Sequence, residues 1–219
     1  MRTEQKSKYY TELIEKNHNQ LEPFYAHSFM TFCELNYLKN EILNCLLFEF
    51  YQASIFSTNH FLERMVKLTL IKNHTQEFSY AEIQKYREKL DESEKDYDGL
   101  TLHNSLAKAY ELNLFTDKQF EYIKTAKNRF RNPFSHAQVS KINENATDFG
   151  GFMFDFNEVK QNLKQGTELR MPERIEIPKF SPAISQMLQE SNSKEIAFKY
   201  FKSIFIILRE VEDKVFNGK

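Results

Sequence analysis

The chain has 219 residues, a length that fits one elaborated domain better than several. Hydrophobic residues make up 41% of it and charged residues 28%, which supplies enough apolar side chains for a buried core and excludes global disorder. The formal net charge of -1 excludes a chain that is basic throughout. Any site for nucleic acid or anionic lipid therefore has to be local.

The chain contains only five Gly and five Pro, which favours long helices. Residues 5–20 are polar with a few apolar positions and predict a surface helix that ends ahead of Pro23. Residues 24–72 contain neither Gly nor Pro, and apolar side chains recur there at spacings of three and four. This stretch predicts one broken or two long helices, with Cys33 and Cys45 as reduced core thiols.

Two patterns of N-terminal helix capping follow. Ser79 with Glu82 predicts a helix that begins there and ends near Leu90, before a solvated loop in the charged run 91–100. A further helix is predicted over 101–114.

Thr116 with Gln119 is the second capping pattern and predicts the start of the helix that leads into a basic segment. No signal-peptide core and no long apolar run occur in the sequence. We therefore expect a soluble, cytoplasmic protein without membrane contact, and we expect no metal site because the His, Cys and acidic residues lack metal-ligand spacing.

Residues 142–182 hold three of the five Gly and three of the five Pro. Apolar residues alternate in two stretches with the period of a β-strand, namely Phe152, Phe154 and Phe156, then Ile175 and Ile177. Ser181 before Pro182 predicts the start of a short helix, and Ser193 predicts the N-cap of a last one. We expect a single domain over 1–219, with 1–23 as a helical extension and about 142–193 as a β-containing or irregular insertion.

The segment 124–136 is the basic exception in a neutral chain. Residues 121–141 hold five Lys or Arg and one Glu, a net charge of +4, and a basic helix face beside a histidine suits a phosphodiester site. Pro133 predicts a kink or helix boundary at Asn132. Residues five apart on a straight helix point about 140° apart, so an undistorted helix does not aim Arg131 and His136 at one bond. On spacing alone, an ordinary surface arginine and a partly buried histidine remain an open alternative.

Residues 131–136, Arg-Asn-Pro-Phe-Ser-His, resemble the R-x4-6-H motif of the HEPN superfamily. The surrounding chain is similar to that family as well: 51–68 resembles its long second helix, 103–106 with 112–115 the helix and turn before the motif, and 195–216 its closing helix. The resemblance covers about 24–141 and 193–216. It implies an antiparallel four-helix bundle, here with an extra N-terminal helix and a small β-containing insertion.

The resemblance also implies chemistry, because active HEPN proteins are frequently dimers that cut RNA without a metal ion or other cofactor. His136 would act as general acid or base, and Arg131 would bind phosphate oxygens. Asn132 would orient either group or hold a phosphate. In such dimers one protomer's histidine works with the other's arginine, which removes the straight-helix difficulty.

Three further residues are candidates for supporting roles. Lys127 and Arg129 are expected to guide backbone phosphates, although a solvated basic face is an equally open reading. Glu63 is a candidate acidic residue from the second helix, with a surface or packing carboxylate as the alternative. Gln138 stands where HEPN toxins paired with nucleotidyltransferase antitoxins often have a modifiable tyrosine, so that form of control is not indicated.

The leading hypothesis is a metal-independent endoribonuclease that cleaves RNA by 2′-hydroxyl attack. It would act as a homodimer and as a toxin or antiphage defence effector, with an antitoxin or regulatory protein as a further partner. The alternative is a non-catalytic HEPN-like helical module that binds a nucleotide or a protein. A third reading gives Arg131 and His136 an architectural role alone.

Overall fold

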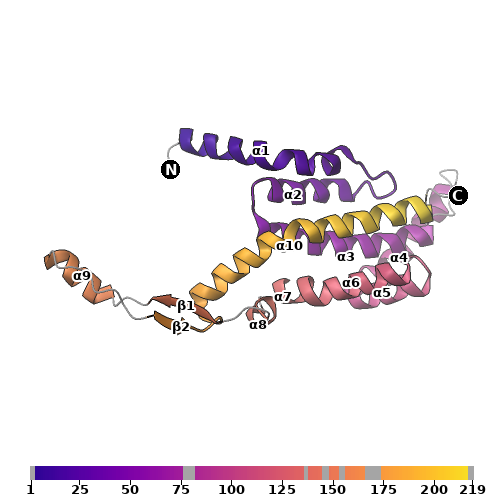
Figure 1. The fold of residues 1–219 in the computed structure, drawn as a ribbon. Helices are drawn as coiled ribbons and strands as arrows, with labels where there is room; N and C mark the ends of the chain where they lie inside the picture. The colour runs from indigo at the N-terminus through magenta and orange to yellow at the C-terminus, as the bar shows by residue number, and fades with distance from the viewer. Residues whose placement is uncertain are drawn as a thin grey trace. The chain divides into compact units, whose positions relative to one another are not determined.

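A computed structural model describes residues 3–75, 82–135, 138–144, 148–152, 156–165 and 174–216. The described residues are mainly helical with one small antiparallel sheet, which confirms the predicted mainly α class (Figure 1). The chain divides into two compact units, unit 1 with Met1–Gln138 and Ser193–Lys219, and unit 2 with Val139–Asn192. The sequence bounds of unit 2 agree to within a few residues with those of the insertion expected at 142–193.

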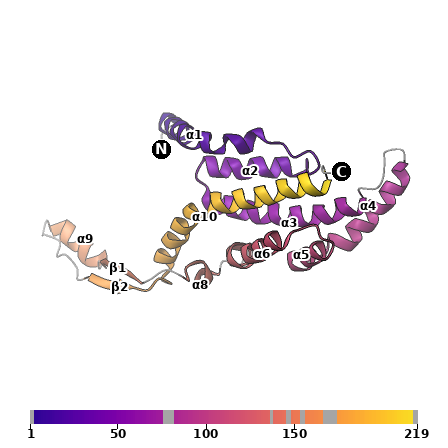
Figure 2. The same ribbon diagram turned by 45° about the vertical axis from the view of Figure 1, so that its right-hand side comes forward.

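Unit 1 is a set of packed helices. They are α1 (Thr3–Ala26), α2 (Leu35–Leu47), α3 (Tyr51–Thr75), α4 (Ile83–Tyr97), α5 (Leu102–Glu111), α6 (Asp117–Ala126), the π-helix η2 (Lys127–Arg131), α7 (Asn132–Ser135), α10 (Pro182–Val211) from Ser193 onward, and the π-helix η3 (Glu212–Phe216). Figures 1 and 2 show α2, α3 and this part of α10 side by side, with α1 along α2 and with α5 and α6 beyond α3.

Helix α3 is central in unit 1 because apolar side chains cover much of its surface. Leu62, Met65, Val66 and Leu70 are fully buried at spacings of three and four, as the sequence pattern predicts. The predicted stretch 24–72 thus holds two long helices. They are separated by a turn in which Glu49 has a left-handed φ of 60° and the Phe50 N–H donates to the Cys45 carbonyl at 2.7 Å.

Helix α1 is longer than predicted, because it runs through Pro23 to Ala26. Pro23 removes one backbone donor only three residues before the end, where few helical bonds depend on it. Packing keeps this last turn helical: Leu21 is 2% exposed, and the Phe24 ring lies 5.0 Å from the Phe205 ring. The prediction of a helix ending ahead of Pro23 was wrong for that reason.

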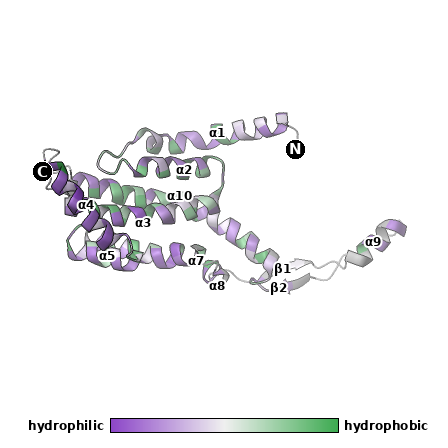
Figure 3. Ribbon diagram, turned by 180° about the vertical axis from the view of Figure 1, so that it is seen from behind, coloured by the Kyte–Doolittle hydropathy of each residue, from purple (hydrophilic) through white to green (hydrophobic). Residues whose placement is uncertain are grey.

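Helix α4 also extends beyond its predicted end near Leu90, since 91–97 is helical and not a solvated loop. Its Lys and Glu residues are good helix formers, and two residues of the run, Ser93 and Tyr97, are buried. The Tyr97 ring packs 6.2 Å from the His74 ring of α3. Figure 3 shows that α4 is otherwise largely hydrophilic. Ser79 of the predicted capping pattern lies outside the described residues.

The sequence predicts two separate helices after Ser181, but the structure has a single continuous helix there, α10, from Pro182 to Val211. Ser193 is a fully buried residue inside it and not an N-cap. The predicted start at Pro182 is confirmed. A serine inside a helix is tolerated where packing supports the helix on both sides, so its capping preference is overridden here.

The cysteines also differ from the prediction of two core thiols. Both are free, but Cys33 is exposed and lies in the turn before α2. Cys45 is half-buried in α2, and burial together with the nearby Glu41 raises the pKa of its thiol.

Unit 2 contains α8 (Val139–Ile142), β1 (Phe149–Phe152), α9 (Phe156–Gln165), β2 (Arg174–Ile177) and the first part of α10. The strands pair antiparallel with Gly151 opposite Ile175, which confirms a two-stranded segment. The expected first strand was placed too late, because Phe152 is the last residue of β1 and Phe156 already begins α9. Phe154 lies outside the described residues.

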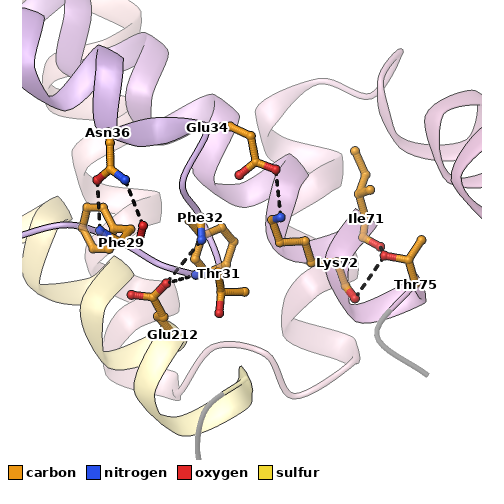
Figure 4. A network of polar contacts seen from close by, with 9 residues as sticks. All are labelled: Phe29, Thr31, Phe32, Glu34, Asn36, Ile71, Lys72, Thr75 and Glu212. Atoms are coloured by element: carbon orange, nitrogen blue, oxygen red, sulfur yellow. Dashed lines mark hydrogen bonds and ion pairs between the residues drawn. The ribbon is translucent and has the colours of Figure 1, made fainter. Parts of the chain in front are cut away.

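A buried carboxylate ties the start of η3 to the turn before α2 (Figure 4). Glu212 is 4% exposed, and its Oε1 accepts hydrogen bonds from the N–H groups of Thr31 at 2.5 Å and Phe32 at 3.2 Å. The same turn is fixed by Asn36, whose side chain bonds both backbone groups of Phe29, at 2.9 and 2.8 Å. These bonds hold an irregular segment against the helices.

Replacing Glu212 by alanine is therefore expected to lower the free energy of unfolding by about 2 to 3 kcal/mol, because two backbone donors lose a charged acceptor. Urea unfolding followed by circular dichroism measures it. Asp213→Asn, at an exposed neighbour, is the matched control and should change stability little. If Glu212→Ala and wild type have the same free energy of unfolding, these hydrogen bonds make no net contribution to stability.

Candidate functional site

The basic segment starts from a well-formed helix. The Thr116 side chain accepts from the Gln119 N–H, and the Gln119 side chain accepts from the Thr116 N–H, so the predicted capping box of α6 is confirmed. After Ala126 the helix widens into η2, where the Asn132 N–H donates to the Lys127 carbonyl five residues back. The sequence did not predict this π-helical turn. Single π-helical turns inside α-helices are frequent at functional sites.

The boundary between η2 and α7 falls between Arg131 and Asn132, where the sequence predicts a kink or boundary. Pro133 has no N–H to donate to the Arg129 carbonyl, so regular α-helical bonding fails at this point. Pro133 and Phe134 are both buried, which anchors the segment directly after Arg131.

The Arg131 guanidinium is held from two sides. Its Nη2 donates to Glu63 Oε2 on α3 at 3.3 Å, and its Nη1 donates to Asn132 Oδ1 at 3.3 Å. The Arg131 and Glu63 side chains are 29% and 28% exposed, so solvent reaches both. The structure thus brings together three of the residues singled out in the sequence.

The contacts to described residues occupy only part of the Arg131 guanidinium. An arginine side chain carries five N–H donors, and two bonds to described residues use one hydrogen on each terminal nitrogen. The remaining donors and the partial exposure leave room for a bidentate contact with an oxyanion such as a phosphate.

Glu63 contacts a second cation as well as Arg131. Its Oε1 lies 3.8 Å from Lys67 Nζ one turn further along α3, and Lys67 also donates to the Asp98 carbonyl. One carboxylate thus lies between two basic side chains, and these three groups together keep a net positive charge. A positive cluster of partly exposed groups attracts anions.

A half-buried and a buried aromatic residue support the backbone just before Arg131. The Phe130 ring packs 4.8 Å from the Tyr200 ring, and the Tyr200 hydroxyl donates to Asn59 Oδ1 at 2.9 Å. Burial raises the pKa of Tyr200, Tyr122 adds to the rise, and the charge of Arg131 opposes it. Tyr200 is 1% exposed, so this contact is part of the core and not of the surface site.

The two further predicted basic residues lie differently. Lys127 Nζ is 3.4 Å from Nδ1 of His103 on α5, whereas Arg129 is exposed with its guanidinium 5.5 Å from the Phe130 ring. His136 lies outside the described residues, so its distance from Arg131 is not part of the structure. Gln138 is half-buried, and its N–H donates to the Pro133 carbonyl at 2.8 Å.

Lys67 and His103 lie beside candidate site residues and were not predicted as their neighbours. Lys67 was detectable, because it follows Glu63 by four residues on a predicted helix and so shares its face. His103 had no such signal, since 24 residues separate it from Lys127.

Comparison with known proteins gave no identification. No family model, curated protein or solved structure matches this chain. Within the described ranges, no three His, Cys, Asp or Glu side chains are grouped so as to hold a metal ion. None of the described helices combines the length and apolarity needed to cross a bilayer. The chemistry of the Arg131 cluster is therefore the basis for a functional proposal.

Proposed function

We propose that this chain is a metal-independent endoribonuclease of HEPN type, with Arg131 and His136 as its catalytic residues. The observation that carries the proposal is the Arg131 guanidinium, which Glu63 and Asn132 orient while it remains partly exposed, with donors that its contacts to the described residues do not use. The motif resemblance supplies the histidine five positions later.

The proposed reaction uses the nucleophile that RNA itself carries. The 2′-oxygen forms a bond to phosphorus while the bond between phosphorus and the 5′-oxygen of the next nucleotide breaks. A base accepts the 2′-hydroxyl proton, and an acid donates a proton to the leaving 5′-oxygen. The products are a 2′,3′-cyclic phosphate and a 5′-hydroxyl.

In this proposal His136 transfers a proton, and Arg131 stabilises the charge that develops on the phosphate oxygens. Asn132 fixes the guanidinium through its Oδ1 and keeps its amide N–H groups for substrate. Lys127 and Arg129 add positive charge for the RNA backbone.

We further propose that two copies pair so that the histidine of one protomer works with the arginine of the other. The five-residue spacing of the motif motivates this arrangement. A cytoplasmic toxin or antiphage effector restrained by an antitoxin or regulatory protein is the biological role that the family resemblance suggests.

An RNA substrate with a single 2′-deoxy nucleotide at the cleavage position tests the proposal. The cleavage position is first mapped on a labelled RNA, and the ribose 5′ of the cut bond is then replaced by 2′-deoxyribose. Cleavage at that bond should disappear while other cut positions persist, because the attacking oxygen is gone. Undiminished cleavage at the deoxy position would contradict the proposed mechanism.

Glu63 is proposed as a positioning residue. Glu63→Ala should lower the cleavage rate by about ten- to a hundredfold, because the guanidinium loses its orienting carboxylate. The free energy of unfolding should fall by about 1 kcal/mol or less, since the ion pair is solvent-screened.

Glu63→Gln should restore part of the rate, because the amide oxygen still accepts from Arg131. Glu121→Ala, which removes a carboxylate paired with Lys124 at 3.1 Å, is the matched control. Single-turnover kinetics with saturating enzyme measure the rate. A purely structural Glu63 would lower stability and leave the rate of the folded fraction unchanged.

The second candidate is a non-catalytic module that binds a nucleotide or a protein. The Glu63 carboxylate already occupies one edge of the Arg131 guanidinium, as in ion pairs that serve structure or binding alone. Saturable nucleotide binding without any strand cleavage would favour this candidate.

A further inference from the structure

His103 and Lys127 form a pair of basic side chains in unit 1. His103 lies in the first turn of α5, Lys127 is the first residue of η2, and Lys127 Nζ is 3.4 Å from His103 Nδ1. A lysine ammonium only donates, so Nδ1 accepts and the ring proton then lies on Nε2. The pair therefore offers N–H donors and no remaining side-chain acceptor.

No carboxylate of the described residues balances the charge of this pair. Among the described residues no acidic side chain lies within ion-pair distance of His103 or Lys127, whereas Lys124 on α6 is paired with Glu121 at 3.1 Å. Both side chains reach solvent. Neighbouring N–H donors whose positive charge is offset by none of the described carboxylates suit an anion with several acceptor oxygens, such as a phosphate.

The pair and the Arg131 cluster share the short helix η2. Lys127 and Arg131 are the first and last residues of η2, and residues four apart on a helix with i to i+5 bonds lie about one turn apart on nearly one side. One helical turn is about 5 Å, the same order as the spacing of neighbouring phosphates along a strand. The helices that supply Glu63 and His103, α3 and α5, pack against each other.

We propose that His103 and Lys127 bind a backbone phosphate next to the one that Arg131 holds on the same RNA strand. This inference rests on the proposed function and extends it, because it gives the enzyme a second phosphate contact that sets where along the strand the cut falls. The contact is to the backbone, so it adds affinity for any base sequence.

Binding of strands that cannot be cleaved tests the pair separately from catalysis. The probes are a fully 2′-O-methylated RNA and a DNA of the same sequence, with affinity measured by fluorescence anisotropy at several salt concentrations. Lys127→Gln should weaken binding about tenfold and reduce the slope of log affinity against log salt by about 0.7, as loss of one phosphate contact requires. His103→Gln should weaken binding about fivefold.

Two variants make the result specific. Lys124→Gln removes the same charge from a lysine that is already ion-paired, so it should change affinity by less than about twofold. Lys127→Arg keeps the charge and should retain the salt slope. Equal losses in Lys124→Gln and Lys127→Gln, or no binding of either probe by wild type at low salt, would overturn the inference.

The outcomes also separate the two proposals. If wild type cuts RNA but the His103 and Lys127 variants bind like wild type, the second phosphate site is wrong and the nuclease stands. If these variants lose binding as expected while wild type cuts no RNA, the phosphate site stands and the nuclease is wrong.

Discussion

Replacing His136 by alanine should lower the rate of RNA cleavage by about 10²- to 10⁴-fold, the range that general acid–base catalysis supplies. An imidazole changes charge near neutral pH and can therefore both accept and donate a proton there. Alanine offers neither. The remaining rate would come from phosphate binding by Arg131 and its neighbours.

Single-turnover cleavage of a labelled RNA measures this effect, with thermal unfolding as the check that the variant is folded. His18→Ala is the matched control, because His18 is an exposed histidine on α1 and has no place in the proposed site. Its variant should cut RNA like wild type. A folded His136→Ala that cleaves at the wild-type rate would remove the histidine from the mechanism.

Replacing Arg131 by lysine should lower the rate by about 10²- to 10³-fold although the charge is kept, as for the loss of one oxyanion-stabilising donor. Arginine contacts Glu63 and Asn132 through two nitrogens and still has donors for phosphate. The single lysine ammonium lacks this planar fork, so it cannot keep both partners and the phosphate in the same geometry.

Arg64→Lys is the control for this substitution, because Arg64 is an exposed arginine next to Glu63 on α3 and takes no part in the described hydrogen bonds and ion pairs of the Arg131 cluster. Rates are compared at saturating enzyme so that weaker RNA binding does not enter. An Arg131→Lys variant as fast as wild type would mean that charge alone is needed, and the forked contact would be wrong.

The parts of the fold that were predictable are those determined by neighbouring residues. The capping box of Thr116 and Gln119 and the periodic apolar face of α3 depend on side chains within a few positions, and both are present. The alternating pattern near Ile175 likewise marked β2.

Packing between distant residues decided two of the misjudged helix boundaries. Pro23 and Ser193 carry local signals to end or begin a helix, yet both lie inside one. The turn after α2 lacked its usual signal, since a left-handed φ of 60° falls on Glu49 where glycine is preferred. The Glu49 side chain accepts a hydrogen bond from Lys16 of α1 at 2.6 Å.

The candidate site was predictable only in part for a similar reason. Arg131 and Asn132 adjoin in sequence, but 68 residues separate Glu63 from Arg131, and no local pattern links them. The family resemblance pointed to Glu63. Neither periodicity nor resemblance indicated the widened turn of η2 or the contact between His103 and Lys127, because both depend on how helices meet.

The most direct test of the central claim is to incubate purified wild-type protein with RNA in excess EDTA and to identify the new ends. The account predicts cleavage that yields 2′,3′-cyclic phosphate and 5′-hydroxyl ends, with none from His136→Ala prepared in parallel. EDTA silences contaminating metal-dependent nucleases, so the ends report on this chain. Intact RNA under these conditions, or ends with a 5′-phosphate, would contradict the account.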